Sequence, residues 1–103
     1  MIVPGLNEII HQPVRLRIMA SLSALGPGER LDFTYLRTLL GVTDGNLGAH
    51  LQKLEEARYI KLTKTFVNRK PCTHIGLTAK GRAAFTAHVA ALQGLLEGVE
   101  SRQ

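Results

Sequence analysis

The sequence predicts a mainly α-helical domain that carries one small antiparallel β-hairpin, an α+β fold. Three observations carry this prediction. Apolar residues recur every three or four positions between residues 14 and 57, as they do along one face of an α-helix. The apolar period changes to two over residues 59–77, which is typical of strands. It returns to helical spacing over residues 79–97.

The first long helix is predicted over residues 14–25. Its apolar positions are spaced by four, four and three residues: Val14, Ile18, Leu22 and Leu25. Pro13 suits the first turn of a helix, where its missing N–H does no harm. Gly26-Pro27-Gly28 ends this helix, and a shorter helix or turn over residues 5–11 is expected to precede it.

A second helix is predicted over residues 33–40. Asp32 is a plausible N-cap for it, and Leu31 before it belongs to a short segment that could pair as a small strand. Gly41 follows the helix, as a C-terminal glycine should. Four apolar residues are predicted on its inner side: Phe33, Leu36, Leu39 and Leu40.

A third helix is predicted over residues 43–57. Thr43 is its natural N-cap, and Asp44 lies in its first turn, where a carboxylate favours the helix dipole. Its apolar stripe consists of Leu47, Leu51 and Leu54. Two helices joined by a three-residue turn with glycine have the geometry of a helix-turn-helix, which we therefore predict over residues 32–57.

A β-hairpin is predicted over residues 59–77, with a turn over residues 68–71. On the first strand, Lys64 interrupts an apolar face formed by Ile60, Leu62 and Phe66. The second strand alternates through Thr73, Ile75 and Leu77.

Thr78 is predicted to cap a last helix over residues 79–97. This helix carries an apolar seam like that of a coiled coil: Phe85, Val89, Leu92 and Leu96. The seam is expected to bury against a symmetry mate or against the N-terminal helix.

The length of 103 residues is that of one domain, which we expect to span residues 1–103. The longest apolar runs are only a few residues, whereas a membrane-spanning helix needs about 20. The first residues, MIVPGLNEII, lack the basic region and cleavage site of a signal peptide. The single cysteine excludes an internal disulfide and, without an export signal, predicts a cytoplasmic protein.

Positive charge is concentrated in one part of the chain. Thirteen Lys and Arg against eight Asp and Glu give a net charge of +5. Residues 58–82 hold seven of the cations and no acid, whereas the rest of the chain has a net charge of −2. This pattern favours a surface that contacts phosphates. The alternative is a solvated hairpin whose basic residues discourage aggregation.

The outward face of the helix over residues 43–57 fits the same interpretation. Asn46 can pair with an adenine edge, and His50 and Lys53 can reach guanine or a phosphate. Gly45 is expected to face a groove and Gly48 to pack against the preceding helix. A satisfied surface histidine is the alternative for His50.

The chain resembles the winged helix-turn-helix transcriptional regulators, and more narrowly a small single-domain group related to the MarR and ArsR types. Three stretches carry the resemblance: HQPVRLRIMASL at 11–22, LDFTYLRTLLGVTDGNLGAHLQKLEEARYI at 31–60 and LTAKGR at 77–82. The resemblance implies sequence-specific binding of double-stranded DNA, with residues 43–57 as the recognition helix in the major groove. The hairpin is then the wing, which lies on the DNA backbone or in the minor groove.

The resemblance also implies two sets of contact residues and a homodimer. The expected DNA contacts are Thr43, Asp44, Gly45, Asn46, Ala49, His50, Lys53, Lys64, Arg69 and Lys70. The expected dimer contacts are Leu6, Ile9, Ile10, Phe85, Val89, Leu92 and Leu96. The sequence identifies no cofactor and no effector, and it does not resemble an enzyme. A winged helix used only for protein contacts and a ligand-sensing regulator are the rival interpretations.

The sequence departs from the family pattern at one helix end. Arg58 stands where the family commonly has glycine between the recognition helix and the first wing strand. Either Arg58 adopts a positive φ or the helix ends differently.

Cys72 and His74 share a strand face and could be two metal ligands, but a closed zinc site needs four. The other histidines show no paired spacing, so no metal site is predicted. Arg69 and Lys70 could lower the pKa of Cys72 and make it redox-active. The alternative is that Cys72 is simply a small hairpin residue.

Overall fold

Five helices and three strands make up the part of the chain that this computed structural model describes, residues 6–100 for the backbone and 6–98 for the side chains. In chain order they are α1 (Glu8–His11), α2 (Pro13–Ser23), β1 (Arg30–Asp32), α3 (Phe33–Leu40), α4 (Asp44–Glu56), β2 (Ile60–Val67), β3 (Lys70–Leu77) and α5 (Ala79–Glu100). Among the described residues, none of the helices combines the length and hydropathy that a membrane crossing requires.

The predicted caps form at both helices of the helix-turn-helix. The Asp32 carboxylate accepts a hydrogen bond from the Tyr35 backbone N–H at 3.1 Å. The Thr43 hydroxyl accepts one from the Asn46 backbone N–H at 3.1 Å. Gly41 ends α3 with φ 67°, a left-handed conformation that glycine adopts at little cost. The local signals in the sequence therefore place α3 and α4 correctly.

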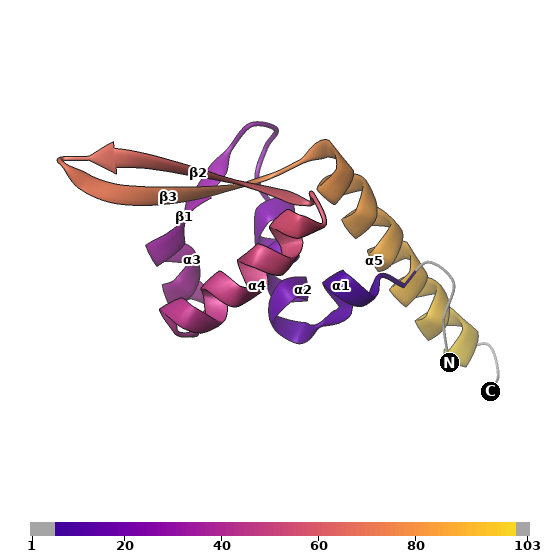
Figure 1. Cartoon of the computed structure of the whole chain (residues 1–103). Helices are drawn as coiled ribbons and strands as arrows, with labels where there is room; N and C mark the ends of the chain where they lie inside the picture. Colours follow the sequence, from indigo (N-terminus) through magenta and orange to yellow (C-terminus); the bar gives the residue numbers. More distant parts are fainter. Residues whose placement is uncertain (1–5, 101–103) are drawn as a thin grey trace.

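The three strands form one antiparallel sheet in the order β1-β3-β2. Ile75 of β3 lies opposite Leu31 on one side and Leu62 on the other. The short strand around Leu31 is confirmed. Beyond this register only β2 and β3 remain paired, and Figure 1 shows them extending past the helices as a hairpin.

The hairpin turn is tighter than predicted. Asn68 and Arg69 both have positive φ values, 51° and 65°, as in a two-residue type I′ turn. Lys70 and Pro71, predicted to lie in the turn, are already part of β3. Near the tip no helix packs against the apolar face of the hairpin, so Phe66 is 77% exposed.

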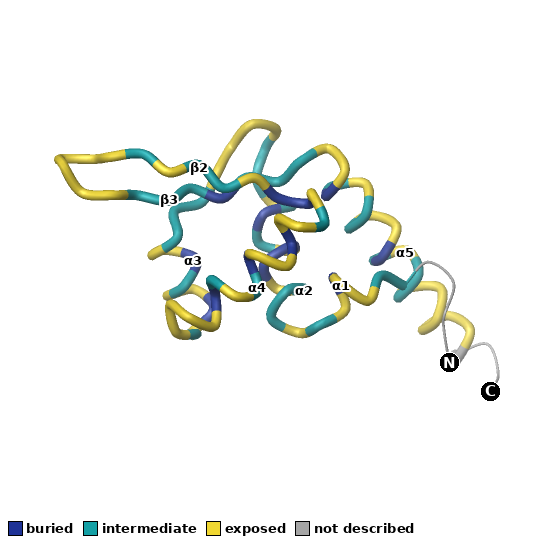
Figure 2. The backbone as a smooth tube through the Cα atoms, in the orientation of Figure 1, coloured by how far each residue is buried: buried dark blue, intermediate teal, exposed yellow. Residues whose placement is uncertain are grey.

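The core lies among the helices and at the base of the sheet, and Figure 2 shows that the projecting part of the hairpin contains no buried residue. Its buried apolar residues are Ile10, Ile18, Met19, Leu22, Leu36, Leu40, Leu47, Leu51, Leu54, Tyr59, Ile60 and Ile75. Leu39 was predicted on the inner side but is 51% exposed. The buried stripe of α3 runs through Leu36 and Leu40, and Leu39 lies about 100° around the helix from Leu40.

Two contacts fix α5 at the base of the hairpin. The Thr78 hydroxyl donates a hydrogen bond to the Arg58 carbonyl at 2.7 Å and accepts one from the Gly81 N–H at 2.9 Å. At Gly81 an added Cβ would lie 2.0 Å from the Tyr59 carbonyl oxygen, so only glycine fits this close approach.

Candidate nucleic-acid interface

α4 has one buried face and one exposed face. Leu47, Leu51 and Leu54 are at most 2% exposed. Of the residues predicted to contact DNA from this helix and its cap, only His50 is half-buried. The others are exposed: Thr43, Asp44, Gly45, Asn46, Ala49 and Lys53. The helix therefore presents a polar surface of small residues and a few long side chains.

The first turn of α4 is tied to α3 by an ion pair. The Arg37 guanidinium donates a hydrogen bond to the Asp44 carboxylate at 2.7 Å. This contact offsets a negative charge that would otherwise repel phosphate at the start of α4. Sequence reasoning missed Arg37, because a separation of seven residues across a turn leaves no periodic signal.

Both glycines of α4 have open space where a side chain would be. An added Cβ would meet no atom within 4 Å at Gly45 or at Gly48. The prediction that Gly48 packs against α3 is therefore wrong. Neither glycine is required by packing inside the protomer, although each lowers helix propensity by up to ~1 kcal/mol relative to alanine.

His50 is paired with a residue of α2. The Arg15 guanidinium lies 3.3 Å from Nδ1 of His50. Burial, followed by the positive charge of Arg15, lowers the pKa of His50 below its ordinary value. His50 is therefore neutral at pH 7, which favours a satisfied histidine over a cationic contact.

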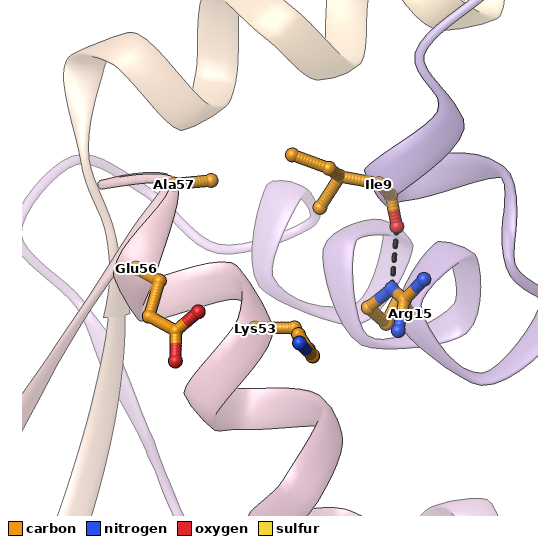
Figure 3. Close-up of a pocket in the computed structure, with 5 residues that line it drawn as sticks. All are labelled: Ile9, Arg15, Lys53, Glu56 and Ala57. Carbon is orange, nitrogen blue, oxygen red and sulfur yellow. Dashed lines mark hydrogen bonds between the residues drawn. The ribbon is translucent and has the colours of Figure 1, made fainter.

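A pocket of about 350 Å³ adjoins the C-terminal half of α4, and its lining comes from Ile9, Arg15, Lys53, Glu56 and Ala57. Figure 3 shows the side chains of Ile9 and Ala57 facing one another across it. Arg15 is held by a hydrogen bond of 2.6 Å from its Nε to the Ile9 carbonyl. Arg15 is a second polar neighbour of α4 that sequence reasoning missed.

The predicted cations of the hairpin lie on its surface, and Arg69 and Lys70 are both exposed. Lys64, farther from the tip on β2, offers a third cation. The two-residue turn places Arg69 at the tip and Lys70 beside it, opposite Val67. No acidic side chain of the described part of the chain forms an ion pair with these three cations.

Arg58 ends α4 with φ 64°. Its N–H donates to the Glu55 carbonyl at 2.8 Å, and the Tyr59 N–H donates to the Leu54 carbonyl at 3.0 Å. These two hydrogen bonds define a Schellman motif, with arginine in the position that glycine usually occupies. The sequence left open whether Arg58 adopts a positive φ or the helix ends differently, and the structure shows the positive φ.

A family model described as a winged helix DNA-binding domain matches residues 14–96 of the chain. The chain belongs to this family. The match confirms the predicted winged helix-turn-helix and the predicted class of function, a DNA-binding regulator. The hairpin of β2 and β3 is thus the wing of a winged helix domain, and α4 is the second helix of its helix-turn-helix.

Similar proteins share nearly the whole winged helix chain. An uncharacterised protein of Methanocaldococcus jannaschii is 37% identical over 93 residues, which cover 90% of this chain and 98% of that protein. A transcriptional regulator homologue from Pyrococcus horikoshii matches with a TM-score of 0.81 and 29% identity, over 90% of this chain and 89% of that one.

Regulators solved with DNA share the winged helix fold at lower identity. MosR from Mycobacterium tuberculosis matches with a TM-score of 0.70 and 22% identity, over 96% of this chain and 68% of that one. MepR from Staphylococcus aureus matches with a TM-score of 0.73 and 16% identity, over 95% of this chain and 77% of that one.

The residues predicted to form a dimer interface of the winged helix protein fall into two groups. Ile10 is fully buried in the protomer's own core, so its side chain cannot reach a second copy, which corrects its assignment. The others are at least partly accessible: Leu6, Ile9, Phe85, Val89, Leu92 and Leu96. Leu96, near the far end of α5, is 63% exposed.

Cys72 lies on the wing strand β3, opposite Thr65, and is not activated. Its thiol donates a hydrogen bond to the Asp32 carboxylate at 3.0 Å. This hydrogen bond, with burial, raises the pKa of Cys72 above its ordinary value. Of the two alternatives raised by the sequence, a pKa lowered by Arg69 and Lys70 is therefore wrong, because the Asp32 carboxylate lies against the sulfur. The thiol is a poor nucleophile.

Proposed function

We propose that this chain regulates transcription as a homodimer that binds double-stranded DNA, with α4 in the major groove and the wing on the backbone or in the minor groove. One observation carries the proposal. The exposed polar face of α4 accompanies a projecting hairpin, and residues 58–82 hold seven cations and no acid. MosR and MepR, which share the fold, were each solved with DNA.

The contacts of α4 would supply sequence preference. Asn46 is exposed in the capped first turn, and its side-chain amide can bind an adenine edge with two hydrogen bonds. Lys53 can reach guanine or a phosphate. Because Gly45 has no side chain, the backbone of α4 can approach the groove closely at this position. DNA binding would therefore explain a glycine that packing inside the protomer does not require.

The contacts of the wing would supply affinity that is independent of sequence. Lys64, Arg69 and Lys70 are cations on a two-stranded extension. Cations at phosphates release counterions, so affinity falls as salt rises. A winged helix that served only protein contacts would have no need of this unopposed charge.

The dimer would form through α5. This helix has 22 residues, or about 33 Å of length, and only part of it packs on the body. Leu95 and Leu96 are 45% and 63% exposed. A hollow of about 370 Å³, lined in part by Phe85 and Val89, lies between α2 and α5. A second copy of α5 would cover these apolar groups.

Ligand sensing is a second candidate, and the pocket beside Lys53 is the observation that favours it. A small anion held by Arg15 and Lys53, with the Glu56 carboxylate also in the lining, would touch α1, α2 and α4 at once. It would thereby couple the recognition helix to the rest of the protomer. A panel of small carboxylates that leaves the melting temperature and the DNA affinity unchanged would reject this role.

The test is the salt dependence of binding to random duplex DNA, measured by fluorescence anisotropy from about 50 to 300 mM salt. The parent chain should bind at about 50 mM with a steep negative slope of log K against log salt. Arg69→Ala combined with Lys70→Ala should weaken binding to all sequences and make the slope shallower, by about 0.9 for each phosphate that the variant no longer neutralises.

Arg17→Ala is the matched control, because Arg17 is an exposed cation of α2 outside the recognition helix and the wing. It should leave the slope nearly unchanged. A parent chain that does not bind at about 50 mM salt would sink the DNA proposal. Equal slopes of log K against log salt for the parent and the double variant would reject a contact between the wing and phosphates, but not DNA binding itself.

A further inference from the structure

Three side chains with metal-binding atoms meet where β1 ends beside the hairpin. Cys72 and His74 share one face of β3, and Asp32 of β1 lies opposite His74 in the sheet register. Sγ of Cys72 is 3.0 Å from Oδ1 of Asp32 and 3.8 Å from Nε2 of His74. One ligand atom from each residue lies within 4.8 Å of the other two.

These separations suit one tetrahedral ion. Bond lengths of about 2.0–2.3 Å place neighbouring ligand atoms of a tetrahedral zinc site about 3.3–3.7 Å apart. The two distances from Sγ bracket that range, and the ligand atoms of Asp32 and His74 lie within 4.8 Å of each other. Small side-chain rotations would bring the three atoms to tetrahedral spacing. Thiolate, imidazole and carboxylate together form a ligand set of the kind that zinc accepts.

The two oxygens of Asp32 have separate tasks. One caps α3 through the Tyr35 N–H, while Oδ1 faces the sulfur. The carboxylate can therefore bind an ion without giving up the helix cap. On the histidine ring, Nε2 is the atom that faces the sulfur, at 3.8 Å, while Nδ1 is buried and has no hydrogen-bond partner.

We propose that Asp32, Cys72 and His74 bind a zinc-class divalent transition-metal ion, with water in the fourth position. The ion would replace the thiol proton, which leaves to solvent. It would join the end of β1 and the start of α3 to the wing strand β3. Asp32, the third ligand, is 40 positions away from Cys72 in the sequence. The spacing of cysteine and histidine residues therefore did not predict a metal site. This proposal is independent of DNA binding.

The test is zinc titration of the untagged, reduced protein in competition with a chromophoric chelator, together with the absorption spectrum of the cobalt form. The parent should bind one ion per chain, and cobalt should give a thiolate charge-transfer band. Cys72→Ser should abolish that band. Cys72→Ser, His74→Gln and Asp32→Asn should each weaken zinc binding at least about tenfold, since even outer-shell partners contribute that much.

Asp32→Asn tests the site without removing the helix cap, because asparagine caps as well as aspartate. His11→Gln removes an exposed histidine outside the cluster and should leave zinc affinity unchanged. Zinc should also raise the melting temperature of the parent and not that of Cys72→Ser. No binding at micromolar zinc, a cobalt spectrum without a thiolate band, or equal zinc affinity in parent and Cys72→Ser would each overturn the proposal.

Discussion

His88 connects three parts of the chain through one neutral ring. It is fully buried on α5, and its Nδ1 accepts a hydrogen bond from the Asn7 backbone N–H at 2.9 Å. The Asn7 amide in turn donates to the Tyr59 hydroxyl at 2.7 Å. A charged ring could not accept at Nδ1, so the contact requires the neutral form.

The first prediction concerns pH. Burial, followed by the charge of nearby His11, lowers the pKa of His88 below its ordinary value of 6.5. Below that pH the unfolded chain takes up a proton that folded His88 resists. The free energy of unfolding should therefore fall as pH falls from about 6.5 towards the folded pKa. Urea unfolding at several pH values between 7.5 and 5 measures this change in the free energy of unfolding.

His88→Asn separates this effect from the titration of other groups. Asparagine keeps an acceptor for the Asn7 N–H, so the variant should fold and show a flatter pH profile than the parent. His11→Gln, on the exposed neighbour, should keep most of the dependence. Parallel pH profiles for the parent and His88→Asn would show that another group causes the pH dependence of stability.

At the scale of elements, the end of α4 determines where the wing begins. The Schellman hydrogen bonds around Arg58 turn the chain from the recognition helix into β2, and Tyr59 and Leu54 are both buried beside them. Arginine at positive φ costs roughly 1–2 kcal/mol relative to its preferred conformations. The chain keeps a cation at this position in spite of the backbone strain.

Arg58→Gly should therefore raise the free energy of unfolding by about 0.5–1 kcal/mol, the relief of strain less the greater freedom of glycine in the unfolded chain. Arg58→Ala, which removes the same charge and keeps the strain, should give no gain. Chemical denaturation of the three proteins measures the difference. Equal stabilisation by alanine and glycine would mean that the charge, and not the backbone, is responsible.

The elements differ in how far their local sequence determines them. Caps and apolar spacing predicted α2, α3, α4 and α5 to within a few residues, because these signals act within a helix. Ile10, Leu39 and Gly48 were misjudged because their surroundings depend on how helices pack against one another. Asp32, Arg15 and Arg37 were missed as neighbours of the candidate sites for the same reason: their contacts join elements that the sequence keeps apart.

The whole molecule is elongated, 59 × 26 × 21 Å. Figure 1 shows the wing extending from one end and the C-terminal half of α5 from the other. If α5 pairs with a second copy, the two wings lie at opposite outer ends of the assembly. The two copies of α4 lie between the wings and would meet two half-sites, which for such dimers are about one helical turn of DNA apart, roughly 34–36 Å.

Leu96→Lys tests this assembly directly. If α5 forms the interface of a dimer, a lysine in its apolar seam should leave a monomer in sedimentation velocity, because a buried, unpaired ammonium group is strongly unfavourable. Ala87→Lys is the control, since Ala87 is exposed and lies on the opposite side of α5 from the seam. A Leu96→Lys protein with the sedimentation coefficient of a dimer would exclude α5 as the interface.

The closed base of the wing has a consequence for how such chains can vary. The Thr78 N–H donates to the Tyr59 carbonyl at 3.0 Å and its hydroxyl donates to the Arg58 carbonyl at 2.7 Å, so both strands are anchored where they leave the body. Opposed residue pairs could be removed from or added to the two strands of the hairpin, and each pair would change its length by about 3.3 Å. The reach of the wing is thus a length that insertions and deletions can adjust in small steps while the helices below stay where they are.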